Sequence, residues 1–175
     1  MAGKKKMETL WAPWRMEYIL SAKEEADASC IFCERLPQKQ DKENLILYRG
    51  KHLFVIMNKF PYNSGHLMVV PNRHTGDLQS LTDEENLELM RTLQLCVRVL
   101  DKVMQPHGYN LGMNMGRVGG AGIEEHLHFH IVPRWNGDTN FMPVIAHTKV
   151  ISEALDKTYD KLKIVFDRFQ QGDAR

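Results

Sequence analysis

Short runs of apolar residues, each bounded by turn-forming residues, predict a β-sheet. The runs are four to eight residues long, which is the usual length of a strand. They lie at residues 45–48, 53–57, 66–70, 109–114 and 127–134. Only Arg49-Gly50-Lys51-His52 separates the first two runs, which predicts a hairpin. The third run ends at Pro71, because proline cannot donate a hydrogen bond to a sheet.

Two later segments follow the 3.6-residue period of amphipathic helices instead. The first begins with Thr82 and Glu85, a capping-box pair in which each side chain binds the backbone of the other residue, and extends to about residue 105. The second covers residues 152–170. Hairpin-connected strands, one long helix and one C-terminal helix predict an α+β fold with an antiparallel sheet of about five strands.

Composition narrows the class of protein without identifying it. A chain of 175 residues has the length of one domain. Its 23 basic and 22 acidic side chains leave a net charge of +1, which argues against a nucleic-acid partner. Three cysteines are too few for a disulfide scaffold, and no apolar run reaches the roughly 18 residues of a membrane span. We therefore expect a cytoplasmic domain with no membrane partner.

Three of the eight histidines occupy alternate positions at the start of the last predicted strand. Because alternate residues of a strand point to one face, we expect His126, His128 and His130 to lie together, with the apolar residues between them facing the core. Neutral imidazoles in such a group suit metal binding or nucleophilic attack on phosphorus. A surface strand that carries histidines by chance is the third possibility.

A glycine-rich loop just before these histidines favours the phosphorus chemistry. Four of the seven residues at 116–122 are glycine, and the loop ends four residues before His126. Such a loop allows backbone N–H groups to approach phosphate oxygens. It lacks the spacing of a P-loop. Phosphate binding beside imidazoles predicts catalysis by a nucleophilic histidine.

At these residues the sequence resembles a known family. The pattern His126-Leu-His128-Phe-His130-Ile-Val matches the signature of the histidine triad superfamily of nucleotide hydrolases and transferases. The match extends to Phe54-x-x-x-Asn58 and to residues 65–71. Residues 133–144 and the segment at 10–15 are similar to the branch that contains bacterial diadenosine tetraphosphate phosphorylases.

The resemblance implies a role for each matching residue. It makes His128 the nucleophile that attacks the α-phosphorus, with His130 and His66 contacting the phosphate. It assigns the ribose to Asn58, the base pocket to Phe32, and further phosphate contacts to Asn114, Gly116, Gly120 and Gly122. Lys59 and Arg134 are additional candidates for phosphate contacts. In one departure, Gly122-Ile123-Glu124 stands where the family often has Gly-Gln-Ser/Thr, so no residue is assigned to protonate the leaving group.

The pair Cys30-x-x-Cys33 is half of a tetrahedral metal site. From spacing alone, two cysteines buried as small apolar residues remain an alternative. The resemblance implies that His74 and His126 complete a closed, structural zinc site with Cys30 and Cys33. We expect no organic cofactor. The third cysteine, Cys96, lies among apolar helix positions and is predicted to belong to the core.

These observations predict three segments and one activity. The segments are an N-terminal arm at 1–29, a histidine triad domain at 30–155, and a C-terminal helix and tail at 156–175. The resemblance implies phosphorolysis of diadenosine tetraphosphate to ADP and ATP, with inorganic phosphate as second substrate. A hydrolase of dinucleoside polyphosphates or nucleoside phosphoramidates, and a nucleotide-binding sensor, are the alternatives. The resemblance also implies a homodimer formed through the long helix and the sheet edge.

Overall fold

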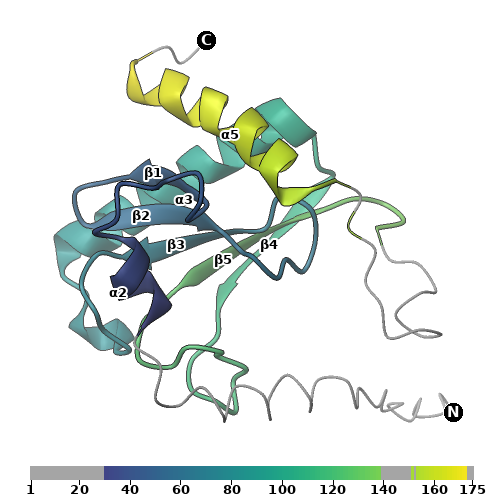
Figure 1. Cartoon of the computed structure of the whole chain (residues 1–175). Helices are drawn as coiled ribbons and strands as arrows, with labels where there is room; N and C mark the ends of the chain where they lie inside the picture. The colour runs from purple at the N-terminus through teal and green to yellow at the C-terminus, as the bar shows by residue number, and fades with distance from the viewer. Residues whose placement is uncertain (1–29, 139–150, 152, 173–175) are drawn as a thin grey trace, which may run out of the picture.

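An antiparallel sheet lies at the centre of the structure, a computed structural model that describes residues 30–138, 151 and 153–172 (Figure 1). Its strands are β1 (Ile46–Arg49), β2 (Leu53–Met57), β3 (Leu67–Pro71), β4 (Gly108–Met113) and β5 (Phe129–Arg134). Within the described ranges they form one five-stranded sheet in the order β1-β2-β3-β5-β4. The predicted fold class is confirmed.

Helices cover both faces of this sheet. They are α2 (Ile31–Arg35), α3 (Asp83–Met104) and α5 (Leu155–Gln170), with a 3₁₀ turn η1 at Leu78–Ser80. The predicted capping box is present at the start of α3, where the Thr82 hydroxyl accepts from the backbone N–H of Glu85 and the Glu85 carboxylate accepts from that of Thr82. Helix α2 is too short to produce a periodic pattern, and the sequence did not predict it.

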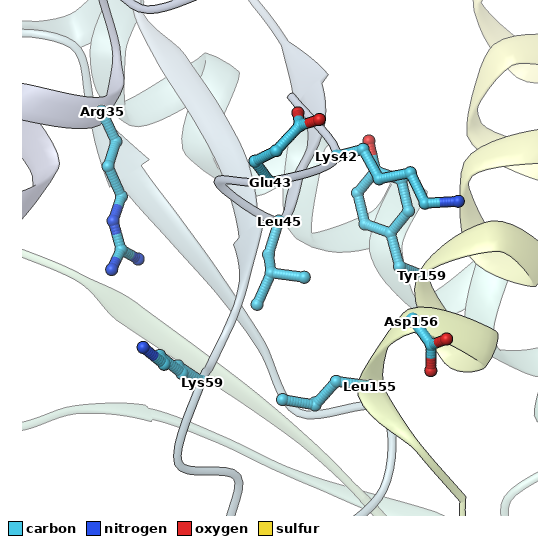
Figure 2. A pocket seen from close by; sticks show the side chains of 8 residues that line it. All are labelled: Arg35, Lys42, Glu43, Leu45, Lys59, Leu155, Asp156 and Tyr159. Atoms are coloured by element: carbon cyan, nitrogen blue, oxygen red, sulfur yellow. The ribbon is translucent and has the colours of Figure 1, made fainter. Parts of the chain in front are cut away.

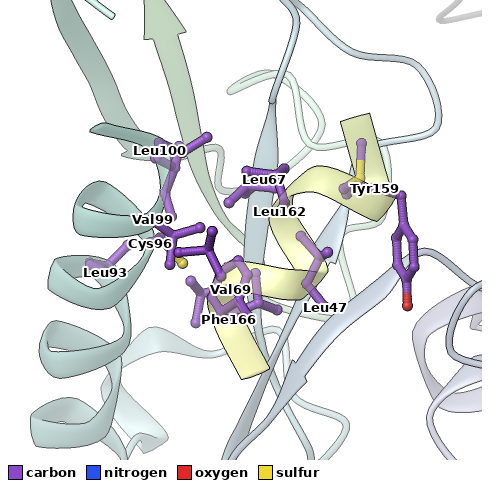
Figure 3. Close-up of a cluster of buried hydrophobic side chains, with 14 of the residues drawn as sticks. Leu47, Leu67, Val69, Leu93, Cys96, Val99, Leu100, Tyr159, Leu162 and Phe166 are labelled. Atoms are coloured by element: carbon purple, nitrogen blue, oxygen red, sulfur yellow. The ribbon is translucent and has the colours of Figure 1, made fainter. Parts of the chain in front are cut away.

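The sheet separates two apolar clusters. Helices α3 and α5 pack on one face, in the larger cluster, where Leu67 and Val69 of β3 meet Cys96 and Phe166 (Figure 3). Cys96 is fully buried there, as predicted. On the other face Phe32 of α2 packs against Phe54, Ile56, Met68 and Val70. Because the strand residues alternate between the two clusters, His130, the partner of Met68 in the β3–β5 pairing, faces the α2 side.

Two predicted boundaries are wrong. Strand β5 begins at Phe129, so His126 and His128 precede the hydrogen-bonded ladder instead of belonging to it. Strand β3 includes Pro71, whose backbone carbonyl still accepts a hydrogen bond although its nitrogen cannot donate one.

The predicted arm at 1–29 and residues 139–144, the second half of the phosphorylase-like segment at 133–144, lie outside the described residues. Among the helices that are described, none combines the length and the apolar character needed to cross a membrane.

Candidate functional site

Five aromatic rings lie side by side on the α2 side of the sheet. Centroid distances are 5.5 Å from Phe32 to His128, 4.9 Å from His128 to His130, 5.1 Å from His130 to His66, and 4.7 Å from His66 to Tyr62. The first four rings are buried, whereas Tyr62 is 49% exposed. We call these residues the ring strip. It brings together the predicted nucleophile His128, both predicted phosphate-contacting histidines and Phe32.

The tautomer of His128 follows from one hydrogen bond. Its Nδ1 lies 2.9 Å from the backbone carbonyl oxygen of His126. A carbonyl oxygen can only accept, so Nδ1 carries the proton and Nε2 of the neutral ring carries a lone pair. Burial lowers the pKa of His128, which favours this neutral form. His128 is therefore held in the form that a nucleophile requires.

His130 is held in the opposite tautomer by a chain of hydrogen bonds. The backbone N–H of Tyr62 donates to Nδ1 of His66 at 3.1 Å, so the neutral His66 ring carries its proton on Nε2. Nε2 of His66 lies 2.9 Å from Nδ1 of His130 and donates its hydrogen bond to it. Because Nδ1 of His130 accepts, the proton of the neutral His130 ring lies on Nε2. Burial and the neighbouring His128 lower the pKa of His130 to about 4, so this ring is also neutral at pH 7.

The Nε2–H group of His130 has no hydrogen-bond partner among the described residues, although it is buried. An unsatisfied buried donor costs about 1–3 kcal/mol, and such groups are uncommon in folded proteins. An acceptor oxygen of a ligand would satisfy it. The strip thus presents a lone pair on His128 and a hydrogen-bond donor on the adjacent His130.

The predicted nucleotide-binding residues fall into two groups. Asn58 lies beside the strip, with its Nδ2 3.4 Å from Nδ1 of His66 and its Oδ1 accepting from the backbone N–H of Phe60. Asn114 instead closes the glycine-rich loop on itself, because its Nδ2 donates to the carbonyl oxygen of Gly120 at 3.3 Å. Gly116 and Gly120 have φ values of +67° and +90°, which glycine adopts more readily than any other residue. Gly122 is an exposed residue of the same loop.

The two additional phosphate candidates lie in different surroundings. Arg134 forms an ion pair with Asp138 at 2.6 Å. Lys59, next to Asn58 in the chain, lines a cavity of about 270 Å³ together with Arg35 and Tyr159 (Figure 2). Figure 2 shows that the other side chains around this cavity come from the segment before β1 and from the start of α5.

The four predicted metal ligands meet beside the inner end of the strip. One ligand atom from each of Cys30, Cys33, His74 and His126 lies within 4.8 Å of all the others. Nδ1 of His126 is 3.2 Å from Sγ of Cys30, 3.5 Å from Sγ of Cys33 and 3.3 Å from Nδ1 of His74. Ligands at about 2.0–2.3 Å around a tetrahedral ion lie about 3.3–3.7 Å apart, so the spacing fits.

The backbone of β3 prepares His126 for this role. Its Nε2 lies 2.8 Å from the carbonyl oxygen of Pro71, so the proton is on Nε2 and the Nδ1 lone pair points into the cluster. Burial and the neighbouring Cys30 raise the pKa of Cys33. A bound cation would lower this pKa and favour the thiolate. Cys30, Cys33, His74 and His126 can therefore hold a metal ion.

Two parts of the site were missed by sequence reasoning. Tyr62 lies in a predicted loop with no pattern that marks it, yet its backbone and its ring both contact His66. Asn63 is buried and donates to the carbonyl oxygen of Pro133 at 3.0 Å and to the Asp138 carboxylate at 2.8 Å, which attaches this loop to the end of β5. Polar loop residues of this kind carry no periodic signal.

Comparisons with known proteins agree with this geometry. The family model for the HIT domain matches residues 39–137. AP-4-A phosphorylase of Mycobacterium tuberculosis is 44% identical over 158 residues, which cover 87% of this chain and 80% of the relative. An adenosine 5'-monophosphoramidase of Saccharomyces cerevisiae is 28% identical over 70% of this chain and 73% of the relative.

A solved structure of a Zn-bound histidine triad family protein from Mycobacterium smegmatis has the same fold, with a TM-score of 0.65. It is 23% identical in sequence, and the match covers 82% of this chain and 97% of that one. The chain belongs to the HIT, or histidine triad, family.

Proposed function

We propose that this protein is a diadenosine tetraphosphate phosphorylase, in which His128 carries the adenylyl group to inorganic phosphate. The observation that carries the proposal is the pair of opposite tautomers, a lone pair on Nε2 of His128 beside an unpartnered donor on Nε2 of His130. The 44% identity to a protein named AP-4-A phosphorylase supports the substrate and the acceptor.

In the first half-reaction, the lone pair on Nε2 of His128 attacks the α-phosphorus of diadenosine tetraphosphate. A phosphorus–nitrogen bond forms, and the bond from the α-phosphorus to the bridging oxygen breaks. The bridging oxygen keeps the electron pair and leaves as part of ATP. The Nδ1–H of His128 remains bonded to the carbonyl oxygen of His126, which stabilises the positive charge on the ring. His130 donates its Nε2–H to a non-bridging oxygen, where negative charge accumulates.

In the second half-reaction, an oxygen of inorganic phosphate attacks the same phosphorus atom. A phosphorus–oxygen bond forms, the phosphorus–nitrogen bond breaks, and the electron pair returns to Nε2 of His128. The product is ADP, and the ring regains its neutral tautomer. The Nδ1–H of His128 keeps its hydrogen bond to the carbonyl oxygen of His126 in both steps, so His128 neither gains nor loses a proton between them.

The other predicted residues have binding roles in this proposal. Asn58, beside His66, binds the ribose of the transferred nucleotide, and Phe32 lines the pocket for its base. The loop that Asn114 closes, with Gly116, Gly120 and Gly122, is assigned to the phosphates; the N–H of Gly120 donates to the carbonyl oxygen of Arg117, so other backbone N–H groups of the loop make the contacts. The two catalytic imidazoles are buried, so water screens their interactions with the reacting phosphorus only weakly.

We further propose that the metal is zinc and that its role is structural. The Cys₂His₂ donor set and its spacing favour zinc, and a structural neighbour of this chain is a Zn-bound protein. Bound zinc would supply a fixed link between α2 and the segment before β5. His126 joins the two centres, because its Nδ1 faces the metal site while its carbonyl oxygen holds His128.

We also propose a homodimer formed through α3 and β4. Strand β4 is an edge of the sheet, and its Leu111 is exposed. Leu87 and Met90 are exposed on α3 at a spacing of three residues, so they lie on one side of the helix. Exposed apolar side chains on a sheet edge and on a helix are the kind of surface that a partner covers.

The test is to incubate the protein with diadenosine tetraphosphate, with and without inorganic phosphate, and to separate the products by chromatography. ADP and ATP formed only with phosphate would support the proposal, and so would an adenylylated protein detected by mass spectrometry without phosphate. His128→Ala should abolish both signals, and His107→Ala, an exposed histidine, should retain them.

Production of AMP and ATP without phosphate would overturn phosphorolysis in favour of hydrolysis. If the protein cleaves adenosine 5'-phosphoramidate and not the dinucleotide, its activity is that of a monophosphoramidase, as in the name of the yeast relative. Activity in His128→Ala would exclude this residue as the nucleophile.

A further inference from the structure

Tyr62 is the one member of the ring strip with a large exposed surface. The other four rings are buried, whereas Tyr62 is 49% exposed. Its inner side lies on His66 at 4.7 Å and close to His130 at 5.7 Å, so the outer part of the ring is the part that solvent reaches. The strip therefore runs from a buried end at Phe32, beside the nucleophile, to an open end at Tyr62.

The backbone holds Tyr62 in this position. Its N–H donates to His66, and the next residue, Asn63, is buried and bonded to the end of β5 through Pro133 and Asp138. A ring whose backbone is fixed in this way and whose inner side packs on His66 and His130 is preorganised, so it loses little conformational entropy when a ligand packs on it. An exposed aromatic side chain that is held in place is well suited to stacking with a flat ligand.

The order of the rings gives a departing polyphosphate a route to solvent at this end. Displacement at phosphorus is in line, so the leaving oxygen lies on the opposite side of the phosphorus from Nε2 of His128. His128 lies at the buried end of the strip, and the unpartnered N–H of His130 comes next. A polyphosphate chain that leaves His128 and passes His130 and His66 reaches solvent at Tyr62.

We propose that Tyr62 is the stacking surface for the base of the leaving nucleoside, and that it is what makes the site prefer a dinucleotide over a mononucleotide. The proposal rests on the adenylyl transfer by His128 proposed above. Stacking of one base on one aromatic side chain corresponds to about a 5- to 150-fold change in affinity. Tyr62 thus acts on the nucleoside that departs, whereas Asn58 acts on the nucleoside that is transferred.

The test compares two substrates with the same reacting phosphorus. Diadenosine tetraphosphate has a distal adenosine, and adenosine 5'-tetraphosphate has the same four phosphates without it. In Tyr62→Leu the ratio of kcat/KM for the first substrate to that for the second should fall about tenfold, mainly through KM. Tyr62→Phe retains the ring and should restore the ratio. Phe60→Leu removes an aromatic side chain that is 75% exposed on the same loop and serves as the matched control, with the ratio of the wild type.

Equal losses for the two substrates in Tyr62→Leu would overturn the proposal, because they would mean that the ring only supports His66 and His130. A change in Phe60→Leu as large as that in Tyr62→Leu would overturn it as well. Binding of the two nucleotides to His128→Ala, measured by calorimetry with and without Tyr62→Leu, needs no turnover. If the wild type is inactive but Tyr62→Leu weakens dinucleotide binding alone, the stacking site stands and the proposed reaction fails.

Discussion

Replacing His66 with alanine should remove the link that sets the tautomer of His130. The ring of His66 is buried, accepts from the N–H of Tyr62 at 3.1 Å and donates to Nδ1 of His130 at 2.9 Å. His66→Ala leaves a part-buried donor, the N–H of Tyr62, and a buried acceptor, Nδ1 of His130, without partners. Each costs about 1–3 kcal/mol, so we expect a loss of about 2–6 kcal/mol in the free energy of unfolding. That is a large part of the stability of a typical domain.

His66→Gln is the matched variant for this prediction. The glutamine side chain offers one acceptor and one donor, as the neutral imidazole does, so much of the loss should be recovered. Urea unfolding followed by circular dichroism measures the difference between the variants. Long-range ¹H–¹⁵N spectra of the wild-type rings report the tautomers directly, and we expect protons on Nδ1 of His128 and on Nε2 of His130.

Equal destabilisation in the two His66 variants would refute this account, because it would show that volume and not hydrogen bonding matters at this position. A proton on Nδ1 of His130 in the wild-type spectra would refute it independently. Either result would also remove the main support for assigning nucleophile and donor to different triad histidines.

Three further predictions concern the metal cluster, the buried imidazole and the cap of α3. Cys30→Ser should lower both the zinc content measured by mass spectrometry and the melting temperature, whereas Cys96→Ala should lower only the latter, since Cys96 is a core residue. The pKa of His130 is about 4 in the fold and 6.5 in an unfolded chain, so the unfolded state binds the proton first as the pH falls. The stability that neutral His130 contributes is therefore lost between about pH 6.5 and pH 4, and His130→Asn should flatten this part of a stability–pH curve. Hydrogen bonds from Arg73 hold the pKa of Glu85 below 4.5, so its contribution is present above pH 4.5 and lost in more acidic solution. Glu85→Gln should lower the urea midpoint at pH 7 and reduce the difference between pH 7 and pH 3; an unchanged difference would contradict the role of this pair.

Elements that depend on local patterns could be predicted from the sequence. The five strands follow from short apolar runs between turn residues, and both long helices follow from the 3.6-residue period of their apolar residues. The cap of α3 needs only Thr82 and Glu85. Boundaries were less accurate, because β5 begins where its hydrogen bonds to β3 and β4 begin and not where the alternation of histidines begins. Helix α2 has five residues and therefore no measurable period.

The composition of the candidate site was also contained in the sequence. The alternating histidines and the glycine-rich loop favoured phosphorus chemistry from the residues alone, and the cysteine pair left a metal site and two buried thiols as alternatives. The resemblance to the histidine triad superfamily then identified His128 as the nucleophile and His74 as a metal ligand together with the cysteines.

Tertiary structure alone decided the protonation of these groups. Each tautomer is set by a group that is distant in sequence or belongs to the backbone: Pro71 for His126, 55 residues away, the carbonyl oxygen of His126 for His128, and His66 for His130, 64 residues away. Side-chain identity does not determine which ring nitrogen carries the proton, because the two neutral tautomers differ little in energy until a fixed partner selects one. The sequence by itself determined which imidazoles are present, and the fold decided which of them presents a lone pair and which presents a proton.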